Sequence, residues 1–232
     1  MAAALYTDGG YAALNPGWHI EDSPWKARQI ARLLGDRGLR PQRVCEVGCG
    51  AGGILTALQE TMPADTEFRG YDISPDAMAI CRPKQNARLS FVQGSPDASE
   101  RFDVLLAIDV IEHVDDYLGY LRRLTGRARH YVFHIPLEMH VSAVARMSPL
   151  LDARRGVGHI HYFSRETALA ALRETGYAVV EERFTNGGLE LRQPRLRTRI
   201  AALPRAMAAA VSPHFAARWL GGFSLLVLAT AD

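Results

Sequence analysis

The sequence predicts an α/β protein built on a doubly wound, mainly parallel seven-stranded sheet. From Arg43 onward, short apolar runs alternate with helix-like segments, a pattern typical of parallel strands covered by helices on both faces. The first run leads into the glycine-rich stretch "VCEVGCGAGG" (44–53), and Asp72 stands at the end of the second. A chain of 232 residues suits one such domain, so a single domain over 1–232 is expected.

Seven apolar segments have the length and composition of strands. They are 43–47, 67–71, 89–93, 102–108, 130–135, 178–184 and 223–229. Helix starts are marked by Ser23-Pro24 and Ser74-Pro75, each a capping hydroxyl before a proline at the first helical position. Ser164 opens another helix, and Gly176 ends it.

Two segments fall outside this alternation. Residues 1–40 hold an aromatic-rich lead followed by an amphipathic helix, and residues 187–222 form an alanine-rich, arginine-rich insert broken by prolines. We expect both to be helical lids over the site.

The charge is mild in total and uneven in distribution. A net charge of +2 and a pI near 8.5 do not indicate nucleic acid, and acidic residues gather between positions 100 and 116. The insert carries six arginines and no acid over 191–221, which fits a peripheral membrane contact, a cap that holds an anionic acceptor, or an ordinary solvated face.

The cysteines and the chain start indicate a reducing environment. Three cysteines form no disulfide framework, and without further ligands nearby in sequence no metal site is expected. The start "MAAALYTDGG" lacks the features of a signal peptide, so we expect a cytoplasmic protein.

The glycine loop fits more than one nucleotide cofactor. Gly48, Gly50 and Gly53 satisfy G-x-G-x-x-G, and glycines at a helix start let a ligand approach the backbone. Glu46, just ahead of the loop, would repel a pyrophosphate and attract an amino group. Asp72 is placed to accept both hydroxyls of a ribose.

Four ordered motifs resemble the class I S-adenosylmethionine-dependent methyltransferases, the seven-stranded Rossmann-like family. They are "VCEVGCGAGG", "YDIS", "FVQGSP" and "FDVLLAIDVIEHVDD". The resemblance covers about 43–229 and implies a C-terminal hairpin, "GYAVVEERF" and "GGFSLLVLATAD", whose last strand runs antiparallel. It implies S-adenosyl-L-methionine as cofactor and methyl transfer to an oxygen or nitrogen atom of a small-molecule or a lipid- or sugar-linked metabolite.

The resemblance also assigns cofactor contacts by position. It places Glu46, Gly48, Gly50 and Gly52 around the methionine moiety, Asp72 on the ribose, Ile73 against adenine, Gly94 and Ser95 at the adenine edge, and Asp109 below the sulfonium. Many relatives carry Asp where Ser95 stands, although a serine hydroxyl can still form a hydrogen bond there.

Histidines after the fourth strand are the candidates for a catalytic base, with His113 favoured and His161 second. His113 follows the carboxyl end of a strand, where doubly wound folds bind ligands. His159 and His161 lie two apart, so in an extended segment they point the same way. Glu112 is expected to orient its loop by hydrogen bonding, and Lys26 to be a solvated helix residue.

Two other functions stay open at this point. A nicotinamide-dependent oxidoreductase would use the same glycine pattern, although Glu46 and the terminal hairpin count against it. A non-catalytic subunit could keep the cofactor pocket without turnover.

Overall fold

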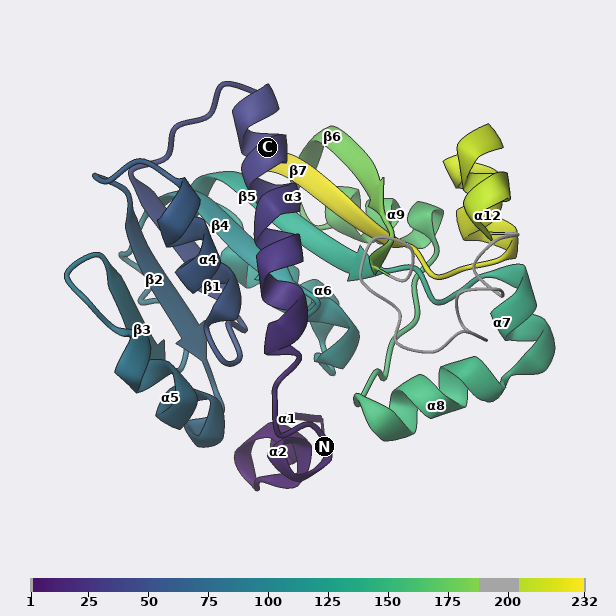
Figure 1. Ribbon diagram of the computed structural model, residues 1–232, viewed down its shortest axis with the longest axis horizontal. Helices are drawn as coiled ribbons and strands as arrows, with labels where there is room; N and C mark the ends of the chain where they lie inside the picture. Colours follow the sequence, from purple (N-terminus) through teal and green to yellow (C-terminus); the bar gives the residue numbers. More distant parts are fainter. Residues whose placement is uncertain (1, 188–204, 232) are drawn as a thin grey trace.

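The computed structural model describes residues 2–187 and 205–231. Its centre is a seven-stranded sheet of order β3-β2-β1-β4-β5-β7-β6 (Figure 1). The strands are β1 Arg43–Val47, β2 Glu67–Asp72, β3 Leu89–Gln93, β4 Phe102–Ile108, β5 Ala128–Pro136, β6 Tyr177–Thr185 and β7 Ser224–Ala231. The predicted ranges of β1, β3 and β4 are matched residue for residue, and the other four strands overlap theirs.

The strand directions confirm the predicted fold. The neighbours from β3 through β2, β1 and β4 to β5 pair in parallel. β7 is inserted between β5 and β6 and runs antiparallel to both, with Val227 opposite Phe133 on one side and Glu182 on the other. The sheet is therefore doubly wound with an antiparallel C-terminal strand.

Helices cover both faces of the sheet (Figure 1). The α-helices include α1 Ala2–Thr7, α2 Gly10–Leu14, α3 Ser23–Asp36, α4 Gly53–Thr61, α5 Pro75–Cys81, α6 Tyr117–Leu124, α7 Val141–Arg146, α8 Ser148–Gly156, α9 Arg165–Glu174 and α12 Pro213–Trp219. Three short 3-10 turns are η1 Ile20–Asp22, η2 Arg82–Lys84 and η3 Ile111–His113. Within the described ranges, no helix is both long and apolar enough to cross a membrane.

Two of the three expected helix caps form. The Ser74 side chain accepts from the backbone N–H of Ala77, and Ser164 makes a capping box with Thr167. The cap expected at Ser23 is wrong, because α3 begins at Ser23 itself and Asp22 precedes it without a side-chain cap. Ser23 instead lies against the glycine loop, where a Cβ on Gly53 would come within 2.5 Å of its hydroxyl.

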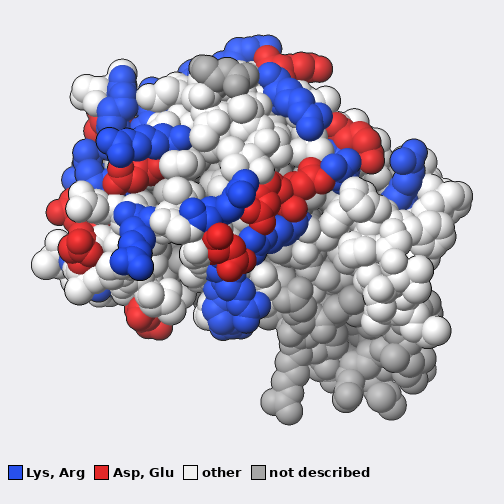
Figure 2. Space-filling view, turned by 90° about the horizontal axis from the view of Figure 1, so that it is seen from above, with Lys and Arg blue, Asp and Glu red and all other residues white. Residues whose placement is uncertain are grey.

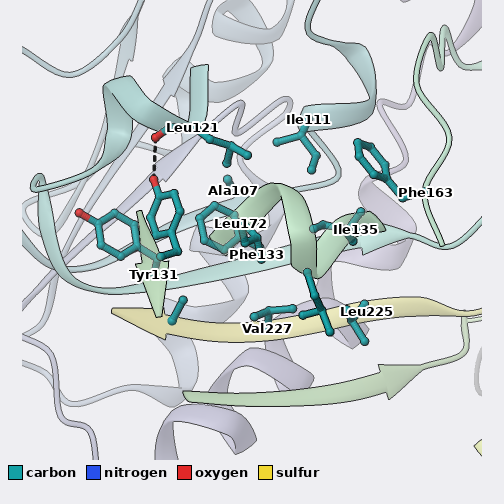
Figure 3. Close-up of a cluster of buried hydrophobic side chains, with 14 of the residues drawn as sticks. Ala107, Ile111, Leu121, Tyr131, Phe133, Ile135, Phe163, Leu172, Leu225 and Val227 are labelled. Atoms are coloured by element: carbon teal, nitrogen blue, oxygen red, sulfur yellow. Dashed lines mark hydrogen bonds between the residues drawn. The ribbon is translucent and has the colours of Figure 1, made fainter. Parts of the chain in front are cut away.

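The apolar core has one cluster on each face of the sheet. α3, α4 and α5 supply the first with residues such as Leu33 and Leu55. The second joins α6 and α9 to β4, β5 and β7, and it includes Tyr131, Phe133 and Val227 (Figure 3). Burial of these side chains on both faces explains the continuous apolar runs of the strands.

The outer surface mixes charges of both signs. Figure 2 shows basic and acidic side chains interspersed over much of one face, with few of either beside the undescribed residues. Of the insert, residue 187 and residues 205–222 are described, so four of its six arginines lie outside the described residues. Phe215 and Trp219 of α12 are about half exposed and stack with ring centroids 5.8 Å apart.

Candidate active site

The glycine loop after β1 closes tightly on the end of β2. Gly48 and Gly50 have positive φ values of 70° and 51°, a conformation that favours glycine. A Cβ on Gly48 would lie 2.6 Å from a methyl carbon of Val110, so only glycine fits there. The Gly50 N–H donates to Asp72 Oδ2 at 2.8 Å, which fixes the loop to the carboxyl end of β2.

Gly52 allows close packing behind the loop. Its φ is 71°, and a Cβ there would lie 2.5 Å from the Phe91 ring. Gly52 therefore lets the start of α4 pack on β3. Gly53, the next residue, lines the cavity, and a place for Gly52 around the methionine moiety stays a prediction.

A cavity of about 620 Å³ opens along the carboxyl ends of β1, β2 and β4. The predicted site residues that line it are Glu46, Gly48, Gly50, Asp72, Ile73, Gly94, Ser95, Asp109 and His113. This is the edge at which doubly wound folds bind ligands. Residues from the N-terminal segment, among them Tyr6, Tyr11 and Trp18, complete its wall.

Glu46 is a buried carboxylate with one unpaired oxygen among the described residues. It is 1 % exposed, and its Oε2 forms no hydrogen bond with any described residue. Burial raises the pKa of Glu46 well above its usual range, although Lys26 acts against that shift. A cationic amino group in the cavity would satisfy this orphaned oxygen, so the residue fits the amino-acid end of S-adenosylmethionine.

Asp72 is already organised to receive hydroxyl groups. Its Oδ2 accepts from Gly50 N–H, and its Oδ1 accepts from Ser74 N–H at 2.9 Å. Burial raises the pKa of Asp72, and these two backbone donors oppose that shift. Each carboxylate oxygen can accept a further hydrogen bond, which suits the two hydroxyls of a ribose.

Asp109 anchors a polar chain at the end of β4. It adopts a φ of 54°, which is unusual for a non-glycine residue. Its carboxylate contacts Lys26 Nζ at 2.7 Å and His134 Nδ1 at 2.6 Å, and His134 Nε2 lies 2.9 Å from the Thr185 hydroxyl. Burial opposes ionisation of Asp109, but His134 and Lys26 outweigh it and hold its pKa well below the usual range.

This chain of contacts corrects the expectation for Lys26. Lys26 is not solvated, because it lines the cavity and pairs with Asp109. Burial alone would lower the pKa of Lys26, but the Asp109 carboxylate raises it. Lys26 therefore keeps its charge beside Glu46 and Asp109.

His113 faces the cavity and is neutral at pH 7. Its Nδ1 lies 2.8 Å from the Tyr6 hydroxyl and 3.2 Å from the Gly158 carbonyl oxygen. Burial, reinforced by the neighbouring His159, lowers the pKa of His113 to about 4. A base with so low a pKa is weak, and it is weaker toward an alcohol than toward a more acidic acceptor such as a phenol.

His161 does not belong to the cavity wall. Its Nε2 lies 3.0 Å from the Val114 carbonyl oxygen, and its ring packs on Tyr117 with centroids 4.8 Å apart. It is absent from the described lining residues, whereas His159 is among them. The contacts of His161 thus favour His159 over it as the histidine that faces the cavity with His113, and a catalytic role of His161 stays a prediction.

Sequence reasoning missed a cluster beside His113. Glu112, His113 and His159 each offer a ligand atom, and these atoms lie within 4.8 Å of one another. Glu112 is 1 % exposed, and neither of its carboxylate oxygens has a hydrogen-bond partner among the described residues. The signal was the pair Glu112-His113 at a strand end, but nothing in the sequence brings His159 to it.

The N-terminal segment supplies an aromatic cover. The Tyr6 and Tyr11 rings lie 4.7 Å apart, and the Tyr11 and Trp18 rings lie 4.9 Å apart. Trp25 of α3 is instead buried against His134, with ring centroids 6.2 Å apart. The first lid expected from the sequence is therefore part of the cavity wall.

The fold and the cavity together are those of a class I methyltransferase: a glycine loop lies beside the carboxylates of Glu46 and Asp72 at the carboxyl edge of a doubly wound sheet. A family model of the methyltransferase domain matches residues 18–182, and the chain belongs to this family. Membership implies S-adenosylmethionine as the cofactor, and it decides against the dinucleotide alternative.

Curated relatives match part of the chain. A ubiquinone biosynthesis O-methyltransferase of Azorhizobium caulinodans is 38% identical over 97 residues, which is 38% of this chain and 37% of that protein. An ajmaline N-methyltransferase of Rauvolfia serpentina is 31% identical over 104 residues, covering 41% of this chain and 35% of that protein. In each case the match spans little more than a third of the relative's length.

Solved structures share the fold over nearly the whole chain. A Haloferax volcanii chain solved in complex with the Trm112 methyltransferase activator superposes with a TM-score of 0.68 and 17% identity, covering 98% of this chain and 97% of that one. A methyltransferase of Thiobacillus denitrificans with bound S-adenosyl-L-homocysteine has a TM-score of 0.59 at 14% identity, covering 96% and 98%. At such identity these likenesses establish the fold alone.

Proposed function

We propose that this protein transfers the methyl group of S-adenosylmethionine to an oxygen atom of a small, partly apolar acceptor. The observation that carries the proposal is that neutral His113 shares one cavity with Glu46 and Asp72. Polar groups for the cofactor and a candidate acceptor site therefore face the same cavity.

The residues divide into two groups by position. Glu46 would take the cofactor's ammonium and Asp72 its ribose hydroxyls, while the backbone at Gly48 and Gly50 permits close approach. When bound, the cofactor supplies an activated methyl group on a sulfonium. The protein then has to align the acceptor oxygen with that methyl and exclude water.

The acceptor side has a mixed character. Tyr6, Tyr11 and Trp18 present aromatic surface, while His113 offers a polar atom. Flat or chain-like acceptors with one hydroxyl suit such a surface, because apolar walls bind the body and a single polar contact orients the reacting group. The ubiquinone-pathway relative, which is an O-methyltransferase by name, supports an oxygen acceptor.

Calorimetry and a turnover assay test the proposal. We expect S-adenosylmethionine to bind the wild-type chain, Asp72→Ala to weaken binding at least tenfold, and the exposed-site control Asp65→Ala to leave it unchanged. Release of S-adenosylhomocysteine would then be measured against panels of phenols, carboxylic acids, alcohols and amines. Binding without turnover would indicate a non-catalytic subunit, and turnover confined to amines would contradict the oxygen acceptor.

A further inference from the structure

We propose that Glu112, His113 and His159 bind a divalent metal ion of the Mn²⁺, Co²⁺ or Zn²⁺ class, which holds the acceptor oxygen beside the methyl donor. The role of the ion in turnover rests on the function proposed above, whereas the metal site itself does not. The ion would lie in the described cavity, because both histidines line it.

The unpaired carboxylate of Glu112 is the first argument. Both of its oxygens are buried and without a hydrogen-bond partner among the described residues. A protonated carboxyl would still need an acceptor for its O–H, and a charged one would need a cation. The imidazoles of His113 and His159 are the neighbouring ligand groups, within 4.8 Å.

The hydrogen bond of His159 leaves one of its nitrogens free for an ion. Nδ1 of His159 lies 2.8 Å from Glu138 Oε2, and because a carboxylate oxygen accepts, this Nδ1 carries the proton. Nε2 of His159 then keeps its lone pair, and a carboxylate behind a histidine is the usual arrangement behind a metal ligand. Nδ1 of His113 contacts the Tyr6 hydroxyl at 2.8 Å and the Gly158 carbonyl oxygen at 3.2 Å; as a ligand, His113 would donate from Nδ1 to that carbonyl and present Nε2 to the ion.

Backbone contacts hold the two halves of the cluster together. The N–H groups of Ile160 and His161 both donate to the Glu112 carbonyl oxygen, at 2.9 and 3.1 Å. The His161 side chain adds its contact with the Val114 carbonyl oxygen. His161 is thus a positioning residue that fixes the segment of His159 against η3.

The spacing requires a modest closure. Ligand atoms about 2.1 Å from one ion, at tetrahedral angles, are roughly 3.4 Å apart. Nε2 of His159 and Oε1 of Glu112 are 4.0 Å apart, and the ligand atoms of the three residues all lie within 4.8 Å of one another, so side-chain rotations of about 1 Å would bring them onto one ion. Two imidazoles and one carboxylate suit transition-metal ions better than Mg²⁺ and leave coordination positions open.

An open position would give the ion a defined chemical task. A hydroxyl bound to the ion loses its proton to bulk water more readily, because the ion stabilises the resulting oxyanion. The oxyanion then forms a C–O bond with the methyl carbon as the C–S bond breaks, and the products are an ether and a neutral thioether. His113 acts here as a ligand of the ion.

Metal binding can be tested without cofactor or acceptor. The chain would be stripped with a chelator and titrated with Mn²⁺ under electron paramagnetic resonance, and with Co²⁺, Zn²⁺ and Mg²⁺ by calorimetry. We expect one equivalent of Mn²⁺, Co²⁺ or Zn²⁺ to bind, and Glu112→Gln and His159→Ala each to weaken it at least tenfold. His159→Gln serves as the second variant if His159→Ala does not fold, as judged by circular dichroism.

Two controls separate this inference from the proposed function. His130→Ala removes a histidine outside the cluster, and Asp72→Ala disables the cofactor side, so both should bind the ion as the wild type does. Ion binding without turnover would support the metal site and contradict only the proposed function. Absence of one-equivalent binding in the wild type, or equal binding by Glu112→Gln and His159→Ala, would overturn the inference.

Discussion

Lys26 Nζ lies 2.7 Å from Asp109 Oδ2, and this ion pair ties the helix before the first strand to the end of β4. Because Asp109 also binds His134 and lies in the cavity, the pair couples α3 to the site. The N-terminal helix is therefore part of the binding structure.

Removal of this cation should affect both stability and binding. Lys26→Met leaves Asp109 with one partner, and we expect a loss of about 1–3 kcal/mol in unfolding free energy, less than for a fully buried pair. Affinity for S-adenosylmethionine should fall as well. Urea unfolding and calorimetry measure the two effects, with Arg28→Met on the same helix as control, and equal behaviour of both variants would show that the pair is unimportant.

Glu46→Gln should stabilise the protein at high pH and weaken its binding of S-adenosylmethionine. The pKa of Glu46 is raised in the folded state, so the folded chain holds a proton that the unfolded chain releases above about pH 4.5. Its contribution is present at low pH and is lost as the pH rises. The variant should thus melt at a higher temperature than the wild type at pH 8 without cofactor, yet bind S-adenosylmethionine more weakly. Tighter binding by the variant would refute this role of Glu46.

His113 should give the opposite pH dependence. Its folded-state pKa of about 4 lies below the unfolded value of about 6.5. Between these values the unfolded chain binds more protons, so this contribution is complete above pH 6.5 and is lost as the pH falls toward 4. Chemical unfolding at several pH values should show a shallower decline in that window for His113→Gln. His130→Gln is the control, and an unchanged slope for His113→Gln would contradict the buried neutral state.

Gly52→Ala should damage folding more than cofactor affinity. Both Gly52 and Gly38 have positive φ, but a Cβ on Gly38 meets nothing within 4 Å whereas one on Gly52 collides with Phe91. Gly38→Ala should therefore lower the unfolding free energy by the backbone strain alone, about 1 kcal/mol. Gly52→Ala should lower it by about 1–3 kcal/mol more, because of the contact with Phe91. Equal unfolding free energies for the two variants would mean that the Phe91 contact is relaxed at no cost.

Sequence patterns predicted the sheet and much of the cavity wall. The strands could be predicted because burial on both faces leaves continuous apolar runs in the sequence. The positions of Glu46, Asp72 and Asp109 could be predicted because parallel strands bring their carboxyl ends to one edge of the sheet.

The sequence could not predict the contacts of side chains whose surroundings come from distant segments. Lys26 meets Asp109 across the fold, His161 turns to Val114, and His159 reaches Glu112 through backbone contacts between separate loops. Gly52 faces Phe91 of another strand. Local spacing holds no information about these pairings.

The antiparallel course of β7 has a practical consequence. Because β7 runs against β5, the chain reaches Ala231 at the amino edge of the sheet, opposite the cavity, while α1 lies on the cavity side (Figure 1). An affinity handle or surface tether attached after β7 would therefore leave the entrance clear. The same handle placed before α1 would sit next to Tyr6 and interfere with ligand access.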